Sequence, residues 1–115
     1  MSNREEGRHP LSLPDRIEAL LEVQDGSVVS RTLLKKPTGT VTLFAFDKGE
    51  GLSEHSTPHD ALVEILEGTA EITLGGTPHP VTAGEGLLLP ANIPHALTAV
   101  TPFKMLLVMI KETAP

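Results

Sequence analysis

Three of the five histidines lie beside short apolar segments, and they are the residues best suited to do chemistry. His55 and His59 follow the glycine turn 49–51, and His95 follows the proline-rich corner 90–94. Neutral imidazole binds zinc, iron and nickel, and it accepts a proton near neutral pH. The chain has no cysteine, which excludes disulfides, thiolate nucleophiles and zinc–thiolate centres. The candidate chemistry is therefore metal binding or proton transfer by histidine.

The spacing of His55 and His59 limits how these two residues can act together. If the segment is extended, alternate side chains share a face, so both imidazoles point the same way. Four extended residues separate them by about 13 Å, which is too far for one metal ion. A bend at Pro58 would have to bring them together before His55, His59 and His95 could form a three-histidine site, which suits a catalytic zinc.

The elements that must position these histidines are predicted to be strands. From residue 27 onward, glycine and proline clusters separate short runs rich in Val, Ile, Leu and Thr, which is typical of an all-β sandwich or barrel. The expected strands are 27–34, 40–47, 52–56, 60–67, 69–75, 78–82, 86–89, 95–100 and 103–111. Gly75 and Gly76 predict a tight hairpin turn, and we expect His79 in its return strand to be solvated.

Two segments are expected before the strands. Residues 1–12 are polar and charged and predict a flexible N-terminal arm, in which His9 has no assigned role. Residues 15–23 predict a short helix, because a proline–aspartate pair starts it and apolar residues recur at helical spacing. The rest of the chain, 13–115, is expected to be a single domain with one core, as the length of 115 residues suggests.

The last predicted strand, 103–111, is apolar on both faces, interrupted only by Lys104. A strand that is apolar on both faces is usually buried on both faces. A single barrel of this size has too little material to cover its own outside. We therefore predict a homodimer, the commonest closed symmetry. The alternative is that residues 11–26 fold back over the sheet.

The composition excludes several classes of partner. The net charge is −6, and the chain has three Phe but no Trp or Tyr. Nucleic acids are bound through clustered basic residues and aromatic platforms, so we expect no nucleic-acid partner. Residues 1–10 lack the apolar stretch of a signal peptide. The longest apolar run, 105–110, is far shorter than the roughly 20 residues of a membrane span. We expect no membrane partner and a cytoplasmic location.

Residues 49–99 resemble the two gapped motifs of the cupin superfamily, in its small single-domain form (cupin type 2). The matching positions are Gly49, His55 and Gly68 in the first motif, and Gly84, Pro90 and His95 in the second. Both motifs agree in order and spacing, and the gap between them has the length usual for small cupins. The resemblance implies an all-β fold, the double-stranded β-helix or jelly-roll barrel, preceded here by a short N-terminal helix or arm.

The first motif is degenerate, and this departure bears on function. Thr57 stands where cupins have a second histidine, and Ala61 or Leu62 where they have a glutamate. In the second motif Asn92 replaces a glycine and Ala99 replaces an asparagine. Of the four metal-ligand positions typical of cupins, only the first histidine and the last remain.

The resemblance implies a divalent metal (Zn, Fe, Ni or Mn) as a candidate cofactor, with His55, His59 and His95 as candidate ligands. Ser56, Thr57 and Thr98 are candidate partners that would orient these ligands. Two alternatives stay open. His55 and His95 could line the pocket without a metal, or one of them could be a structural histidine.

The barrel mouth predicts a pocket for one small organic molecule. The expected lining residues are Thr57, Ala61, Val63, Phe44, Phe46, Leu89, Met105 and Leu107. The first functional hypothesis is a protein that binds a small molecule, with or without a metal. The alternatives are a metal-dependent oxygenase, isomerase or lyase, a metal-free catalyst with a histidine base, and a dimer that binds no ligand. No catalytic residue is assigned.

Overall fold

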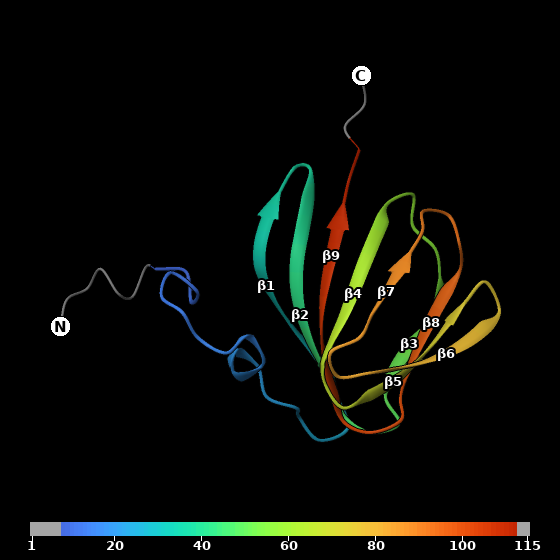
Figure 1. The fold of residues 1–115 in the computed structure, drawn as a ribbon, viewed down its shortest axis with the longest axis horizontal. Helices are drawn as coiled ribbons and strands as arrows, with labels where there is room; N and C mark the ends of the chain where they lie inside the picture. Colours follow the sequence, from blue (N-terminus) through green and yellow to red (C-terminus); the bar gives the residue numbers. More distant parts are fainter. Residues whose placement is uncertain (1–7, 113–115) are drawn as a thin grey trace.

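The computed structural model describes residues 8–112, which form nine strands and the 3-10 helix η2 (Ile17–Leu20). The strands are β1 (Val28–Lys36), β2 (Gly39–Phe46), β3 (Gly51–His55), β4 (Asp60–Glu67), β5 (Thr69–Leu74), β6 (Thr77–Thr82), β7 (Gly86–Leu89), β8 (His95–Ala99) and β9 (Phe103–Ile110). They form two antiparallel sheets, with strand orders β1-β2-β9-β4-β7 and β3-β8-β5-β6 (Figure 1). The predicted all-β architecture is confirmed.

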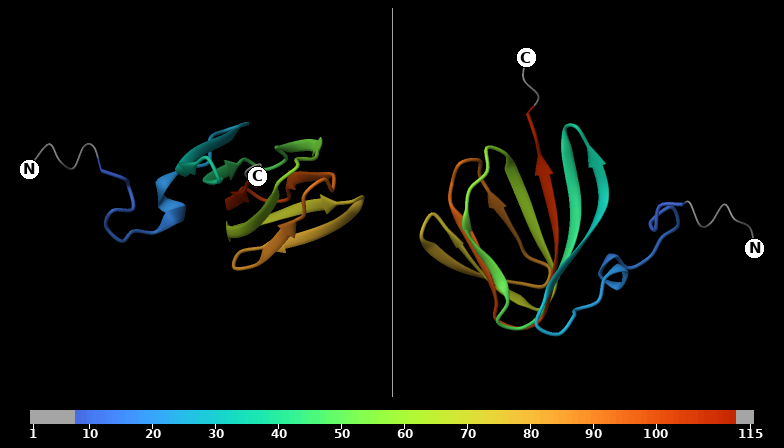
Figure 2. Two further views of the ribbon diagram at one scale, coloured as in Figure 1. Left: turned by 90° about the horizontal axis from the view of Figure 1, so that it is seen from above. Right: turned by 180° about the vertical axis from the view of Figure 1, so that it is seen from behind.

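The two sheets lie on opposite sides of the barrel (Figure 2), and their inward side chains form one core. Strand β4 buries Ala61, Val63 and Ile65, because alternate side chains of a strand share a face. The rings of Phe46 and Phe103 stack in this core with their centroids 4.3 Å apart. Burying a side chain of this size stabilises the fold by roughly 1.5–3 kcal/mol. The pair therefore anchors the closed end of the barrel.

The chain crosses from the five-stranded to the four-stranded sheet at Gly68, between β4 and β5. The φ angle of Gly68 is 77°. A Cβ atom at this position would lie 2.1 Å from the carbonyl oxygen of Pro102. Only glycine avoids both the left-handed strain and this clash. The predicted hairpin turn at Gly75 and Gly76 is also present, with both residues at positive φ.

The helix predicted over residues 15–23 is reduced to the single turn η2. Two side chains from the five-stranded sheet hold its backbone. Lys104 donates to the carbonyl oxygen of Glu18 over 2.8 Å, and Arg31 donates to that of Leu20 over 2.9 Å. A longer α-helix would bond such carbonyls to its own N–H groups. Contacts with the sheet thus replace helical hydrogen bonds.

The N-terminal segment, residues 8–24, lies on the β1 side of the barrel (Figure 1). The ring of His9 bonds the carbonyl oxygen of Leu33, so this histidine has a structural contact that the sequence did not suggest. Residues 1–7 of the predicted arm lie outside the described residues. The segment covers the lower part of the outer face of the five-stranded sheet, where Leu43 and Ala45 are fully buried. Within residues 8–112, no segment covers the part of that face that carries Leu34, Leu62, Leu88 and Ile110.

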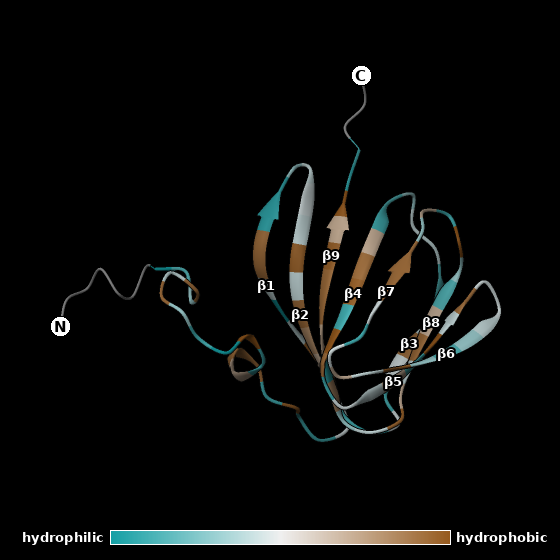
Figure 3. Ribbon diagram, viewed as in Figure 1, coloured by the Kyte–Doolittle hydropathy of each residue, from teal (hydrophilic) through white to brown (hydrophobic). Residues whose placement is uncertain are grey.

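The outer faces of the two sheets differ in chemistry. The uncovered face of the five-stranded sheet carries exposed Leu34, Leu62, Leu88 and Ile110, and Figure 3 shows hydrophobic segments on all five strands. The outer positions of the four-stranded sheet are small, polar or proline residues. Within residues 8–112, no helix is long and apolar enough to cross a membrane.

Candidate functional site

Two neighbouring strands bring His55 and His95 together at the barrel mouth. His55 ends β3 and His95 begins β8, and the two residues are direct partners in the antiparallel register. Side chains of directly opposed residues project to the same face of a sheet. The Nε2 atoms of the two rings lie 3.2 Å apart, and the ring planes meet at 70°. Residues forty positions apart in the chain thus share one site.

Hydrogen bonds to the backbone fix which nitrogen of each ring carries the proton. Nδ1 of His55 lies 2.9 Å from the carbonyl oxygen of Ser53, and Nδ1 of His95 lies 3.2 Å from that of Ile93. A carbonyl oxygen only accepts, so each Nδ1 must donate. In the neutral rings each Nε2 then carries a lone pair. Two lone pairs that face each other at 3.2 Å repel, unless a proton or a cation lies between them.

The environment of His95 favours its neutral form. His95 is 7% exposed, whereas His55 is open to solvent. Burial lowers the pKa of His95 from its usual value, the hydrogen bond to the Ile93 carbonyl raises it, and charge on His55 lowers it further. The net effect is a lowered pKa, so His95 presents a lone pair to the pocket over a wider pH range than a free histidine.

A cavity of about 50 Å³ lies beneath the two rings. Its lining residues are Leu52, His55, Thr57, Ala61, Val63, Leu89, His95, Leu97, Met105, Leu107 and Met109. Among the described residues, His55 and His95 are the only ionisable side chains in this lining. A volume of this size holds a few water molecules. Only one end of an organic ligand fits below the mouth in this conformation.

Six of the eight expected wall residues do line the cavity: Thr57, Ala61, Val63, Leu89, Met105 and Leu107. The sequence interpretation missed Leu52, Leu97 and Met109. Strand parity could have found the last two, since Leu97 follows His95 by two positions and Met109 follows Leu107 by two. Leu52 is harder to find, because the register between β3 and β8 shifts between Leu52 and His55.

Phe44 and Phe46 were expected in the pocket wall but are not among its lining residues. Phe46 is fully buried and stacks on Phe103, and Phe44 packs against the same core. Both face inward, as the predicted parity allows. They lie toward the closed end of the barrel, where Phe46 pairs with Phe103, and outside the set of residues that line the cavity.

His59 is half-buried, and it is not among the lining residues. It belongs to a tight turn in which Thr57 Oγ1 accepts from the backbone N–H of His59 and donates to its carbonyl oxygen. Across residues 8–112, no third His, Cys, Asp or Glu joins a pair to make a metal cluster. The bend at Pro58 therefore does not assemble the three-histidine site.

The rim of the mouth is held by hydrogen bonds from the β7–β8 loop to residues 57–60. The N–H of Asn92 donates to the carbonyl oxygen of Thr57 over 2.7 Å, and that of Ala91 donates to Asp60 Oδ1 over 2.8 Å. Asn92 has a φ of 66°. Asparagine tolerates this left-handed conformation better than most residues do, which explains how it replaces the glycine of the second motif.

His79 is half-buried, not fully solvated as predicted. It lies opposite Ile72 in the β5–β6 ladder. Because Ile72 points into the core, His79 shares the inner face at the edge of the sheet. The sequence pattern Gly-Gly-Thr-Pro-His-Pro did not reveal this parity, since prolines flank the histidine on both sides.

Comparison with curated proteins finds two partial relatives. Protein SchB of Streptomyces halstedii is 40% identical over 48 residues, which are 41% of this chain and 35% of that protein. Polyketide synthase CurC of Streptomyces cyaneus is 35% identical over 71 residues, which are 56% of this chain and 46% of that protein. The matches thus span less than half the length of either curated relative.

Solved structures match over most of the chain. A conserved protein of unknown function from Streptococcus pyogenes has 39% identity and a TM-score of 0.85, and the match covers 90% of each chain. A cupin superfamily protein from Desulfitobacterium hafniense has 30% identity and a TM-score of 0.85 over 90% of this chain and 94% of that one. A family profile described as "Cupin domain" matches residues 42–110. With both cupin motifs in register on a two-sheet barrel, the chain belongs to the cupin family.

Proposed function

We propose that this protein binds a small, uncharged organic molecule at the barrel mouth, together with a divalent metal held by His55 and His95. The observation that carries the proposal is the convergence of two Nε2 atoms, 3.2 Å apart, above an apolar cavity. Facing lone pairs in such a place are costly unless something binds them. A site of this kind is suited to a ligand rather than to packing.

The two histidines meet the demands that a metal ion makes on a pair of its ligands. Imidazole nitrogens bind Zn²⁺ at about 2.0–2.1 Å, so two of them on one ion can lie about 3.2 Å apart. Metal-bound histidines usually donate their other N–H to a carbonyl or carboxylate. His55 and His95 both do so, through Ser53 and Ile93. The pair therefore fits two adjacent ligand positions, and backbone carbonyls orient the rings in place of the predicted Ser56, Thr57 and Thr98.

The protein contributes only two such ligands among its described residues, which leaves the remaining positions to water or to the organic molecule. A bound divalent metal would act as a Lewis acid toward a carbonyl or enolate oxygen. The chain's own part is to hold both rings in the Nδ1–H form and to surround them with apolar walls. Met105 and Met109 add flexible side chains that adapt to the shape of a ligand.

The lining indicates the class of organic ligand. Phosphates and carboxylates are recognised by Arg or Lys, and the cavity wall contains neither. An uncharged, largely apolar molecule with one oxygen that reaches the histidines suits these walls best. The name of one partial relative, a polyketide synthase, supports polyketides as the first ligand class to test. Catalysis as an oxygenase, isomerase or lyase is the alternative, favoured by the open ligand positions on the metal.

Isothermal titration with Zn²⁺, Ni²⁺, Mn²⁺ and Fe²⁺ tests the metal site. We expect one ion per chain for at least one metal, and loss of binding in His55→Ala and in His95→Ala. His59→Ala is the matched control, since this histidine lies on the same loop but outside the pocket, and it should bind normally. No binding by the wild type, or equal loss in the control, would remove the metal from the proposal.

Thermal denaturation with a ligand panel tests the organic part separately. Uncharged polyketides should raise the melting temperature of the wild type, and sugar phosphates of similar size should not. Leu97→Phe fills the cavity and should abolish the shift, while Thr98→Val on the opposite face of the same strand should retain it. A shift that survives Leu97→Phe would place the ligand elsewhere.

We also propose that the functional unit is a homodimer. The support is the uncovered apolar face of the five-stranded sheet, where Leu62, Leu88 and Ile110 are each at least half exposed. Light scattering at micromolar concentration should give twice the chain mass of 12.2 kDa. A mass of one chain would contradict this part of the proposal and leave the pocket unaffected.

A further inference from the structure

A row of five apolar side chains crosses the outer face of the five-stranded sheet. The register pairs Leu34 with Val41, Val41 with Val108, Val108 with Leu62, and Leu62 with Leu88. Each of the five strands thus contributes one residue at the same level. Leu34, Leu62 and Leu88 are 50–54% exposed. Contiguous exposed apolar surface of this kind is typical of an interaction site.

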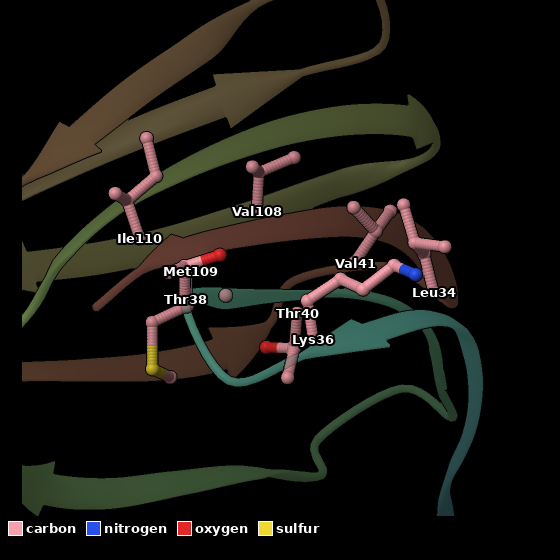
Figure 4. Close-up of a pocket in the computed structure, with 9 residues that line it drawn as sticks. Leu34, Lys36, Thr38, Thr40, Val41, Val108, Met109 and Ile110 are labelled. Atoms are coloured by element: carbon pink, nitrogen blue, oxygen red, sulfur yellow. The ribbon is translucent and has the colours of Figure 1, made fainter. Parts of the chain in front are cut away.

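The two ends of this row have different shapes. At the β1–β2 end, a hollow of about 350 Å³ lies between the N-terminal segment and the sheet, lined mainly by Leu11, Ile17, Leu33 and Leu106. A second hollow of about 210 Å³ lies beside Val41 and Val108. Figure 4 shows Leu34, Val41, Val108 and Ile110 on one side of the sheet, with Met109 on the other.

At the β4–β7 end the apolar side chains are exposed. Leu62 on β4 and Leu88 on β7 are 50% and 54% exposed, and Ile110 on the neighbouring strand β9 is 64% exposed. The hollow among these residues is only about 100 Å³. One end of the face therefore offers space, and the other offers side chains that could fill it.

Charges on the same face follow the same division. Exposed Lys36 and Arg31 lie on β1, at outer positions. Exposed Asp60 and Glu64 lie at outer positions on β4. The basic strand β1 is thus one edge of the sheet, and the acidic strand β4 lies beside the other edge, β7. A face with opposite charge at its two ends is complementary to a second copy of itself when the ends are exchanged.

Two sheets that face each other can be related by a two-fold axis in the plane between them. If the axis runs across the strands, β1 of one subunit lies over β1 of its partner, which sets like charge on like charge. If it runs along the strands, β1 and β2 lie over the partner's β4 and β7. We propose the second arrangement for the homodimer, with the axis near β9. It places Leu34 near Leu88 of the partner subunit and Lys36 near Asp60 of the partner subunit.

This arrangement rests on the homodimer proposed above, and cysteine cross-linking separates the two claims. The natural chain has no cysteine, so Leu34→Cys and Leu88→Cys each introduce a single reactive thiol. Facing sheets lie about 10 Å apart, beyond the reach of a disulfide, so a short bis-maleimide is the suitable reagent. The two variants are mixed, exchanged through urea and refolded before cross-linking, and each is first shown to melt like the wild type.

We expect a cross-linked dimer from the mixture and little from either variant alone. Val108→Cys, close to the axis, should cross-link with itself, and Thr98→Cys on the four-stranded sheet should not. If Leu34→Cys cross-linked with itself as efficiently as it does with Leu88→Cys, the proposed arrangement would be wrong. The homodimer itself would not be contradicted. A monomeric mass for the wild type in light scattering would overturn both.

Discussion

The two sheets of the barrel share one core but present opposite outer surfaces. On the five-stranded sheet one residue from each strand forms an apolar row. On the four-stranded sheet the corresponding row is Gly51, Thr98, Glu71 and Pro80. The proline lies on the edge strand β6, where it blocks pairing with another sheet. An exposed apolar row is suited to contact with another apolar surface, whereas a row of small, polar and proline residues is suited to water.

The largest effects should come from the inner faces, where the sheets are alike. Phe103→Ala on the five-stranded sheet should cost about 3–5 kcal/mol of unfolding free energy, and Ile72→Ala on the four-stranded sheet about 2–5 kcal/mol. Both side chains are fully buried. Urea denaturation measures both values. If Ile72→Ala hardly changed the unfolding free energy, the four-stranded sheet would contribute little to the core. The inner faces of the two sheets would then not be alike.

The same substitution should affect self-association differently on the two outer faces. Leu62→Lys places a charge in the apolar row and should weaken self-association by about 30-fold or more, which is about 2 kcal/mol. Thr98→Lys places the same charge on the other sheet and should leave association unchanged. Sedimentation over a range of concentrations gives both constants. Equal weakening by the two variants would show that the faces do not differ in role.

The rim loop between β7 and β8 joins the two sheets at the mouth, and Asn92 holds its conformation. Asn92→Ala should destabilise the protein by about 1–2 kcal/mol, because a left-handed φ is unfavourable for alanine. Asn92→Gly keeps this φ without strain and is the control. If both variants melt together, the left-handed residue does not constrain the loop.

The smallest effect concerns Asp47, in the link between β2 and β3. Its carboxylate accepts from the N–H groups of Gly26 and Lys48, and these bonds lower its pKa from the usual 3.8. The contribution to stability is therefore present above about pH 3.8 and is lost as the pH falls through the lower, folded-state pKa. Asp47→Asn should lower the urea midpoint slightly at pH 7. The difference from the wild type should shrink as the pH falls below 3.8, and a difference that does not change with pH would contradict this assignment.

Much of the fold could be predicted because glycine and proline residues mark the turns between the strands clearly. Gly68, Gly75 and Gly76 mark turns that the structure contains, and the alternation of Ala70 and Ile72 gives the correct inner face. The helix over 15–23 could not be judged from the sequence. Its length depends on Lys104, a residue more than eighty positions away, whose side chain donates a hydrogen bond to the carbonyl oxygen of Glu18.

The candidate site could be predicted only in part, because long-range contacts also decide which residues reach the mouth. His55 and His95 were found from motif spacing, and strand pairing brings them into contact. His59 has the correct parity but belongs to a turn held by Thr57. Phe44 and Phe46 also have an inward parity, but parity gives no depth along the barrel axis. Distance from the mouth depends on register between strands, and no local pattern encodes that.

Because His55 pairs directly with His95, the geometry of the site depends on the register between β3 and β8. A slip of one residue between β3 and β8 would turn one imidazole to the outside. The two nitrogens would then no longer face each other, although most of the barrel could remain folded. If His55 and His95 hold a metal as proposed, uptake of a coloured ion such as Co²⁺ during refolding would report when these two strands reach their final alignment.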